Sequence, residues 1–587
     1  MGPGIFFKTW LLYTAVILIG LGILNLFITS IPPINKRYQN PVKRFFLFFN
    51  FSCLFGTVGL IALVKGDLET GYQEFGLFLL FTGVVTTFFS RRIIKRAPKI
   101  PEIAILISLI LFVLTSGTYW ASNLHFSSAV RHQSSDFSGQ IKNVCLLVMD
   151  TARGDHFSCN GYSFITTPNI DRIAEEGLLY TKAFSASNWT PPGHISIFTG
   201  KYPSQHGNNG KAYMPDELVS LTEILHQEGY YCMAMYNNPL AGGNINLTQG
   251  FDNDIGVFGS HWVYPAPFRL WDKFVKRDSG SKITFSMAQA TFEWMKKRGA
   301  HLFLYINVTE PHAPYNVHEP YFSDFTQFLN KDKIGNIEQT KELCRTLDLI
   351  IHDSTRFVGS NEESYRYIRA TYDSEMAYCD HYFGKFADWM DAAGLLNETL
   401  LVITADHGEF LGEHLTMGHP ELLFNPVLRI PLILRYPRLI KPKVDDGYAS
   451  NVDVFPTVLN LMGLEDRIPE NVSGMNLLED QSRDKRPLLS ANINSGGGVY
   501  SLIDGSYKLI VNADEFLPKY FAQDTLLFDL DNDPNELFNL HISKIEILGN
   551  LAFQLDDWID HITVAPQSTI EVSDATIANL KALGYVH

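Results

Sequence analysis

The chain has 587 residues, of which 46% are hydrophobic and only 19% are charged. The charged share lies below the usual value of about 25%, and the composition excludes a disordered chain, a collagen-like chain and a coiled coil. The net charge is −15, although residues 1–130 carry an excess of positive charge. The rest of the chain is therefore strongly acidic, which argues against general nucleic-acid binding, because that function needs a basic surface.

The first fifth of the chain contains four long apolar stretches without acidic or basic side chains. They are Trp10–Ile31, Phe45–Val64, Phe75–Phe89 and Ile103–Ala121. Three of them approach the ~20 residues with which a helix crosses the hydrocarbon core of a bilayer, and the third is the shortest. We expect residues 1–125 to form a transmembrane module of four helices that anchors the protein, followed by a linker over residues 126–140.

The charges of the connecting loops predict the orientation of these helices. The loops after the first and third stretches are basic, whereas the loop after the second carries Asp67, Glu69 and Glu74 against Lys65. Cytoplasmic loops carry an excess of lysine and arginine. The two basic loops should therefore face the cytoplasm. This predicts a multi-pass protein of the cell membrane with an extracytoplasmic catalytic domain.

From Ile141 onward, short apolar runs alternate with amphipathic stretches. Continuous apolar runs, typical of buried strands in a parallel sheet, occupy residues 143–150, 301–309, 400–406 and 428–437. Helical patterns occupy residues 167–176, 221–228, 285–297, 364–392 and 454–461. The alternation predicts an α/β domain over residues 141–484 with helices on both faces of its sheet. A hairpin signal at Asp504-Gly505 predicts a small antiparallel subdomain with a terminal helix over residues 485–587.

Three segments of the α/β domain carry side chains that suit a hard divalent metal ion. Asp150 ends the first apolar run, and Asp406 and His407 end a later one. Between them lies the segment WTPPGH at residues 189–194. Active residues in such sheets gather at the carboxyl ends of the strands. Carboxylates and imidazoles at these ends are ligands for Mg²⁺, Mn²⁺ or Ca²⁺, so we expect a metal site there.

The chain contains, in this order, the segments NVCLLVMDTARGDHFSCNGY, TPNIDRIAEEG, WTPPGHISIFTGKYPSQHG, EPHAPY, YDSEMAYCD, ITADHGEFLGEH, LRIPLILRYP, VDVFPTVLNLMG, GSYKLI and LFDLDNDPNELFNL. In wording and order they resemble the sulfatase branch of the alkaline phosphatase superfamily. These segments run through most of residues 141–587. The resemblance implies an alkaline-phosphatase-like sheet and an enzyme that hydrolyses or transfers phosphate or sulfate esters.

The resemblance also implies roles for individual residues. The divalent metal would be bound by Asp150, Thr190, Asp406 and His407, and Thr190 occupies the position of the nucleophile. Three histidines would complete the catalytic site. They are His194 at the position of the motif's arginine, His312 as a contact of the substrate's oxyanion, and His419 where many sulfatases have a lysine.

The nucleophile segment departs from the sulfatase pattern. Sulfatases make formylglycine from a cysteine or serine followed by x-Pro-x-Arg, whereas this chain has Thr190 and, four residues later, His194. The second aspartate of the usual pair is replaced by Thr151. In these respects the chain is similar to the phosphoethanolamine and phosphoglycerol transferases of the superfamily. Those enzymes use an unmodified threonine, one catalytic metal and several membrane spans.

The expected reaction is attack by Thr190 on phosphorus or sulfur, followed by release of the covalent ester to water or to an acceptor hydroxyl. The three histidines would offset charge on the non-bridging oxygens, and His312 or His419 would protonate the leaving group. The expected substrate is a lipid- or glycan-linked phosphate or sulfate ester. Two alternatives remain: a true sulfuric ester hydrolase without formylglycine, and a non-catalytic protein that binds an anionic polymer.

Overall fold

The computed structural model describes residues 141–207, 213–257, 280–334, 362–479, 486–494, 497–512 and 524–560, together with residues 340, 341 and 344. All of them belong to one compact unit, Val130–His587. The expected transmembrane stretches and the linker lie outside the described residues. Within the described ranges, no helix is both long and apolar enough to cross a membrane.

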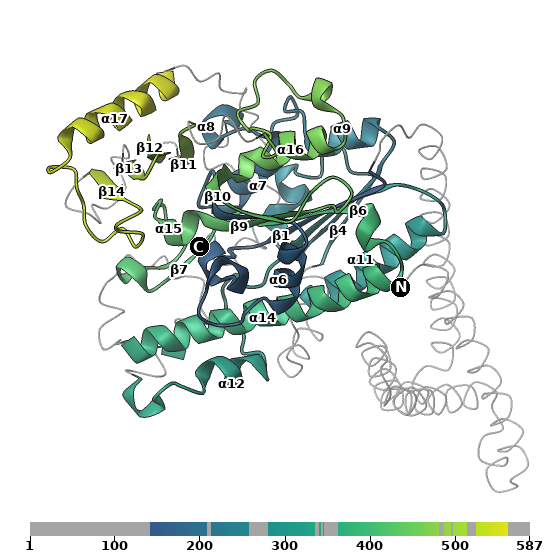
Figure 1. Ribbon diagram of the computed structural model, residues 1–587, viewed down its shortest axis with the longest axis horizontal. Helices are drawn as coiled ribbons and strands as arrows, with labels where there is room; N and C mark the ends of the chain where they lie inside the picture. The colour runs from purple at the N-terminus through teal and green to yellow at the C-terminus, as the bar shows by residue number, and fades with distance from the viewer. Residues whose placement is uncertain are drawn as a thin grey trace, which may run out of the picture. The chain divides into compact units, whose positions relative to one another are not determined.

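An eight-stranded sheet forms the centre of the described unit (Figure 1). Its strands, in order across the sheet, are β10 (Lys443–Ser450), β2 (Leu178–Phe184), β9 (Arg429–Arg435), β6 (Thr399–Ala405), β1 (Asn143–Met149), β5 (Leu302–Val308), β3 (Tyr231–Tyr236) and β4 (Asn253–Gly256). The four apolar runs predicted as strands form β1, β5, β6 and β9. Every residue of β1, β5 and β6 is buried, which explains their continuous apolar sequences.

One strand departs from the parallel arrangement that such runs indicate. β9 is antiparallel to both of its neighbours, β2 and β6, whereas β1 is parallel to both β5 and β6. A strand buried on both faces has no alternation of polarity, so its sequence carries no information about the direction of its neighbours. The interpretation of residues 428–437 as a strand of a parallel sheet is therefore wrong, and the sheet is mixed.

Helices cover both faces of this sheet. One face packs against α6 (Pro168–Glu175), α11 (Ser281–Lys296) and α14 (Glu362–Ala392), and the other packs against α7 (Thr190–Thr199), α9 (Leu221–Gln227) and α16 (Val454–Leu461) (Figure 1). The shorter helices are α8 (Pro203–His206), α12 (Tyr321–Thr326) and α15 (Asn425–Leu428). All five helices predicted from periodicity form. α9 shows the local cause, because Ser220 and Glu223 make a reciprocal capping box at its start.

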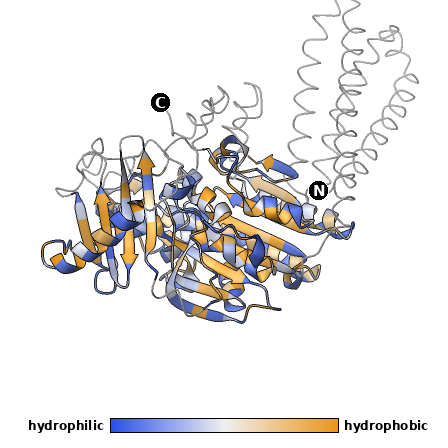
Figure 2. Cartoon of the chain, turned by 90° about the horizontal axis from the view of Figure 1, so that it is seen from above, coloured by the Kyte–Doolittle hydropathy of each residue, from blue (hydrophilic) through white to orange (hydrophobic). Residues whose placement is uncertain are grey.

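A small antiparallel sheet lies C-terminal to the large one, as predicted. It contains β11 (Leu488–Asn494), β12 (Gly497–Asp504), β13 (Tyr507–Asn512) and β14 (Thr525–Asp529), followed by α17 (Ile545–Asp560). The β12–β13 hairpin turns at Gly505, whose φ of +58° favours glycine. Leu502 and Leu509 face α17, and Val499 and Ile510 face the α/β domain. Figure 2 shows apolar residues along the strands of both sheets.

Candidate active site

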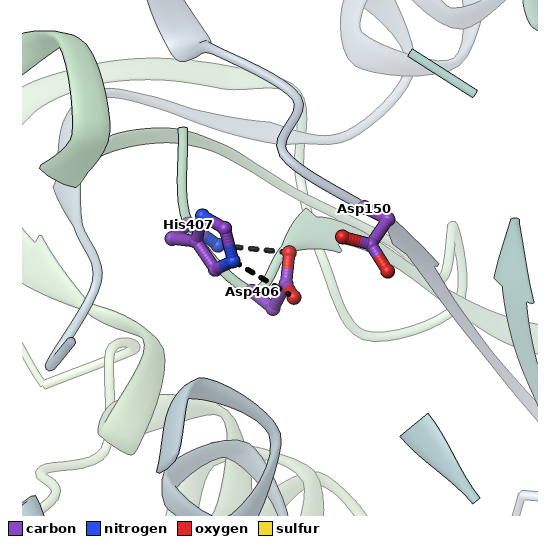
Figure 3. A group of neighbouring side chains, drawn as sticks. All are labelled: Asp150, Asp406 and His407. Atoms are coloured by element: carbon purple, nitrogen blue, oxygen red, sulfur yellow. Dashed lines mark hydrogen bonds and ion pairs between the residues drawn. The ribbon is translucent and has the colours of Figure 1, made fainter. Parts of the chain in front are cut away.

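Two carboxylates follow neighbouring strands at the same edge of the large sheet. β1 and β6 pair so that Met149 lies opposite Ala405, and the next residues are Asp150 and Asp406. His407 follows directly. One ligand atom from each of Asp150, Asp406 and His407 lies within 4.8 Å of the other two, and all three residues are buried (Figure 3).

Each carboxylate has one oxygen in hydrogen bonds and one without. Oδ2 of Asp150 accepts a hydrogen bond from Nδ2 of Asn238 at 2.8 Å. Oδ1 of Asp406 accepts from the backbone amides of Thr151 at 3.1 Å and His407 at 2.9 Å. The remaining oxygens, Oδ1 of Asp150 and Oδ2 of Asp406, have no hydrogen-bond partner. Two buried, unsatisfied anionic oxygens are costly without a positive charge beside them.

The imidazole of His407 is oriented for metal binding. Its Nδ1 donates to the carbonyl oxygen of Gly408 at 2.8 Å, which leaves the lone pair on Nε2. This Nε2 lies 3.5 Å from Oδ2 of Asp406 and 3.3 Å from Oγ1 of Thr190. Burial, reinforced by the neighbouring His419, holds the pKa of His407 well below its usual range, so the ring is neutral as a ligand must be.

The residues fit a divalent cation. Burial and the adjacent Asp406 raise the pKa of Asp150 to about 6, and burial raises the pKa of Asp406 to about 7. Both shifts show that the site lacks compensation for negative charge. Two carboxylate oxygens, one imidazole nitrogen and a hydroxyl oxygen form a donor set that suits Mg²⁺, Mn²⁺ or Ca²⁺.

Thr190 reaches this cluster because α7 begins against the end of β6. Trp189 is extended and Thr190 is the first helical residue, followed by two prolines that cost little at positions without an intrahelical N–H partner. A Cβ on Gly193 would lie only 2.7 Å from the backbone oxygen of Asp406. Glycine at this position therefore permits the close approach that places the Thr190 hydroxyl beside His407.

His194 lies one turn further along α7. Its Nδ1 donates to the carbonyl oxygen of Thr190 at 2.9 Å and lies 3.5 Å from Oδ2 of Asp406. Its Nε2 is buried and has no hydrogen-bond partner. Burial lowers the pKa of His194, although the charge of Asp150 opposes that shift. The histidine at the sulfatase arginine position thus contacts the carboxylate cluster as well as the nucleophile segment.

His312 and His419 complete the group. The ring centroid of His419 lies 4.6 Å from that of His407 and 5.5 Å from that of His312. Burial lowers the pKa of His312, but the negative charges of Asp150 and Glu409 outweigh it and raise the pKa. Burial and the neighbouring His312 lower the pKa of His419 to about 3. The structure therefore brings all seven predicted residues together. The pKa values of His312 and His419 are shifted in opposite directions.

Two supporting residues were not identified from the sequence. Asn238, which holds Asp150, is the second residue after β3, so its signal is the polar ending of an apolar run, as it was for Asp150. Tyr315 donates its hydroxyl to Oε2 of the buried Glu409 at 2.6 Å. It lies within the EPHAPY segment, but nothing in the residue pattern indicates its partner 94 positions away.

Thr151 stands where sulfatases have the second aspartate of the pair, and it contacts Asp406 through its backbone amide. Its φ of +55° lies in the left-handed region, which is unfavourable for a β-branched residue. This conformation accompanies the hydrogen bond from its amide to Oδ1 of Asp406. Its own Oγ1 is buried without a hydrogen-bond partner. The backbone of Thr151 therefore helps to hold Asp406.

Comparison with known proteins identifies the family. The sulfatase family model matches residues 142–464, more than half of the chain. The chain belongs to the sulfatase family. A second model, N-sulphoglucosamine sulphohydrolase, C-terminal, matches residues 412–560 of this sulfatase-family chain.

Individual relatives of this sulfatase-family chain have low sequence identity to it, but the similarity extends over most of their length. An arylsulfatase of Clostridium perfringens is 23% identical in an alignment 454 positions long that covers 68% of this chain and 90% of that protein. An endo-4-O-sulfatase of Bacteroides thetaiotaomicron is 25% identical in an alignment 445 positions long that covers 65% of this chain and 82% of that protein. The solved phosphonate monoester hydrolase of Agrobacterium radiobacter has a TM-score of 0.56 at 20% identity, covering 71% of this chain and 95% of its own. The predicted alkaline-phosphatase-like α/β fold and the expectation of a sulfatase-like ester hydrolase are confirmed.

Proposed function

We propose that the protein is a membrane-anchored, metal-dependent hydrolase or transferase that cleaves phosphate esters through Thr190, outside the cytoplasmic membrane. The observation that carries the proposal is the position of the Thr190 hydroxyl, 3.3 Å from Nε2 of His407 at the edge of the buried cluster. A threonine cannot be oxidised to the aldehyde that formylglycine provides. An unmodified hydroxyl beside a cation site suits direct attack on phosphorus.

When bound by Asp150, Thr190, Asp406 and His407, a divalent cation supplies positive charge that favours the alkoxide form of the nucleophile. Oγ1 of Thr190 forms a bond to phosphorus as the bond to the leaving oxygen breaks. His312, whose pKa is raised by the negative charges of Asp150 and Glu409, offsets charge on the non-bridging oxygens. The N–H of His419 donates to the leaving oxygen. Water or an acceptor hydroxyl then attacks phosphorus and releases Oγ1 of Thr190.

The membrane location and the substrate source rest on the sequence. Four apolar stretches and their basic loops support an anchored enzyme with an extracytoplasmic catalytic domain. A lipid- or glycan-linked ester is the expected substrate of an enzyme held at that surface. The topology is tested with a membrane-impermeant maleimide on intact cells. Ser134→Cys in the linker should be labelled, whereas Lys95→Cys should be labelled only after permeabilisation.

A second candidate is a true sulfuric ester hydrolase that works without formylglycine. The family model and the arylsulfatase and endo-4-O-sulfatase relatives favour it. The two candidate functions use the same site, but the nucleophile attacks phosphorus in the first and sulfur in the second. A glycan-linked sulfate ester would then be its substrate.

The deciding experiment is a substrate panel on the purified full chain with Mn²⁺ or Mg²⁺. The panel contains an aryl phosphate monoester, an aryl phosphodiester, an aryl phosphonate and an aryl sulfate. Phosphorus-ester turnover that is lost in Thr190→Ala and retained in Thr190→Ser supports the proposal. Turnover of the sulfate alone supports the second candidate. Silence on every ester, together with no bound metal, would favour the non-catalytic alternative.

A further inference from the structure

A buried asparagine links the nucleophile segment to the loop that carries His419. Asn188, two residues before Thr190, is fully buried. Its Nδ2 donates to the carbonyl oxygen of Pro420, the residue after His419. Its Oδ1 accepts a hydrogen bond from Nδ2 of Asn492 at 2.8 Å. The orientation of the Asn188 amide is fixed, because a carbonyl oxygen can only accept.

Asn492 reaches this point because β11 lies beside the nucleophile segment. β11 is an edge strand of the small sheet, with β12 as its neighbour in that sheet. Along its edge away from β12, it contacts residues 185–188. The amide of Ala491 donates to the carbonyl oxygen of Ala186 at 2.8 Å, and Oγ of Ser490 donates to that of Ser185 at 2.6 Å. β11 also packs against α8, which follows α7 in the chain (Figure 1). The small sheet is thus attached to the segment that delivers Thr190.

The hydrogen bonds from Asn492 through Asn188 to Pro420 end next to His419, the histidine that assists the leaving group in the proposed function. Pro420 follows His419 directly, and the His419 ring lies 4.6 Å from the ring of His407, whose Nε2 contacts Thr190. A change in the Asn188–Pro420 contact would therefore alter the distance between His419 and the nucleophile. Misplacement of a reacting group by about 1 Å can cost on the order of 100-fold in rate.

We propose that Asn188 and Asn492 are positioning residues that hold His419 at a fixed distance from Thr190. The C-terminal sheet thereby sets the geometry of hydrogen-bond donation to the leaving oxygen. This inference rests on the proposed function, in which His419 assists departure of the leaving group. Neither asparagine contacts the reacting atoms in this scheme.

The test compares Asn492→Asp with Asn512→Ala. Aspartate keeps the size of asparagine but cannot donate to Oδ1 of Asn188 when ionised. Asn512 is the matched control, because Asn492, Val499 and Asn512 form one cross-strand row and Asn512 lies two strands away. Asn492→Ala is the second variant should Asn492→Asp fail to fold. For each variant, kcat and KM are measured on phenyl and 4-nitrophenyl esters of the same phosphorus acid.

A positioning role predicts a specific pattern. In Asn492→Asp, kcat should fall about 10-fold or more for the phenyl ester and much less for the 4-nitrophenyl ester, because a good leaving group needs little assistance. KM should change little, and Asn512→Ala should match the wild type. An equal loss on both esters, a change confined to KM, or parity with Asn512→Ala would overturn the inference.

A crystal structure of Asn492→Asp separates this inference from the proposed function. If the wild-type protein hydrolyses none of the esters, the proposed function fails, yet the structural claim still has its own readout. Displacement of Pro420 and a longer separation between the rings of His407 and His419 support the link. A separation that stays at 4.6 Å contradicts it.

Discussion

Gly193 on α7 and Asp406 at the end of β6 touch backbone to backbone, since a Cβ on Gly193 would lie 2.7 Å from the carbonyl oxygen of Asp406. Gly193→Ala must therefore move α7 away from the sheet and carry Thr190 with it. We expect a loss of activity on the order of 100-fold and a destabilisation of about 1–3 kcal/mol. Steady-state kinetics and denaturant unfolding measure the two effects.

The matched control is Gly549→Ala in α17. No atom lies within 4 Å of a Cβ built there, so alanine should be neutral or stabilising by up to about 1 kcal/mol because of its higher helix propensity. Unchanged kinetics in Gly193→Ala would contradict the packing argument.

Metal removal should make stability depend on pH in a defined direction. In the metal-free protein, burial raises the pKa of Asp150 to about 6 and that of Asp406 to about 7, both above their unfolded values near 4. Their contribution to stability is thus present below pH 4 and is lost as pH rises through about 6 to 7. The apparent Tm after chelation should fall across this window, and added Mn²⁺ should restore it at pH 7.

Asp150→Asn separates this effect from other buried acids such as Glu409 and Asp380, whose pKa values are also raised by burial. The metal-free variant should be more stable at pH 7 than the metal-free wild type, because a neutral amide removes one buried charge. It should also gain less stability from Mn²⁺. If metal-free Asp150→Asn is less stable at pH 7 than the metal-free wild type, the predicted cost of the buried charge is contradicted.

Asn238 should control metal affinity although it is not a ligand. Its amide holds Oδ2 of Asp150 and so directs Oδ1 toward the cluster. Loss of such an orienting partner typically weakens metal binding by about 10–100-fold, which we expect for Asn238→Ala. Calorimetric titration with Mn²⁺ measures the change. Asn246→Ala, at a loop contact with Met214, should bind Mn²⁺ as the wild type does.

A buried ion pair of the C-terminal subdomain is bonded to the α/β domain through Asn425. Nζ of Lys508 on β13 lies 2.6 Å from Oε1 of Glu536, both side chains are fully buried, and Asn425 at the start of α15 bonds to each of them. Lys508→Met leaves the carboxylate unpaired and should destabilise the protein by about 3–5 kcal/mol.

Adding Glu536→Gln should recover much of that loss, because no buried charge then remains. The exposed pair Arg172–Asp388 offers a comparison, and Arg172→Met should cost less than about 1 kcal/mol. Equal unfolding free energies for Lys508→Met and Arg172→Met would show that the buried pair contributes nothing.

Only part of what burial determines in the fold could be predicted from the sequence. The continuous apolar runs of β1, β5, β6 and β9 predict strands correctly, whereas β2, β3, β4 and β10 are not among the predicted strands, although β3 is apolar and buried throughout. β2 contains Thr181 and Lys182, and β10 is a bulged strand at the end of the sheet with two acidic residues. The direction of a strand could not be predicted either, because the apolar sequence of β9 is compatible with both parallel and antiparallel neighbours.

The candidate site divides in the same way. Polar residues that end buried strands point to the metal cluster, and family resemblance supplied the three histidines. The contacts of Asn188 depend on Pro420 and Asn492, which lie more than 200 and 300 positions away in the sequence. No local pattern encodes such pairs, so they became visible only once the chain was folded.

The place of β9 in the sheet has a consequence for synthesis of the protein. β9 at residues 429–435 lies between β2 at residues 178–184 and β6 at residues 399–405. During translation, β2 and the nucleophile segment that follows it therefore leave the ribosome about 250 residues before the strand that joins them to β6. A nascent chain that ends before residue 429 should lack an assembled site, so the enzyme should acquire activity late, after nearly three quarters of its length has been made.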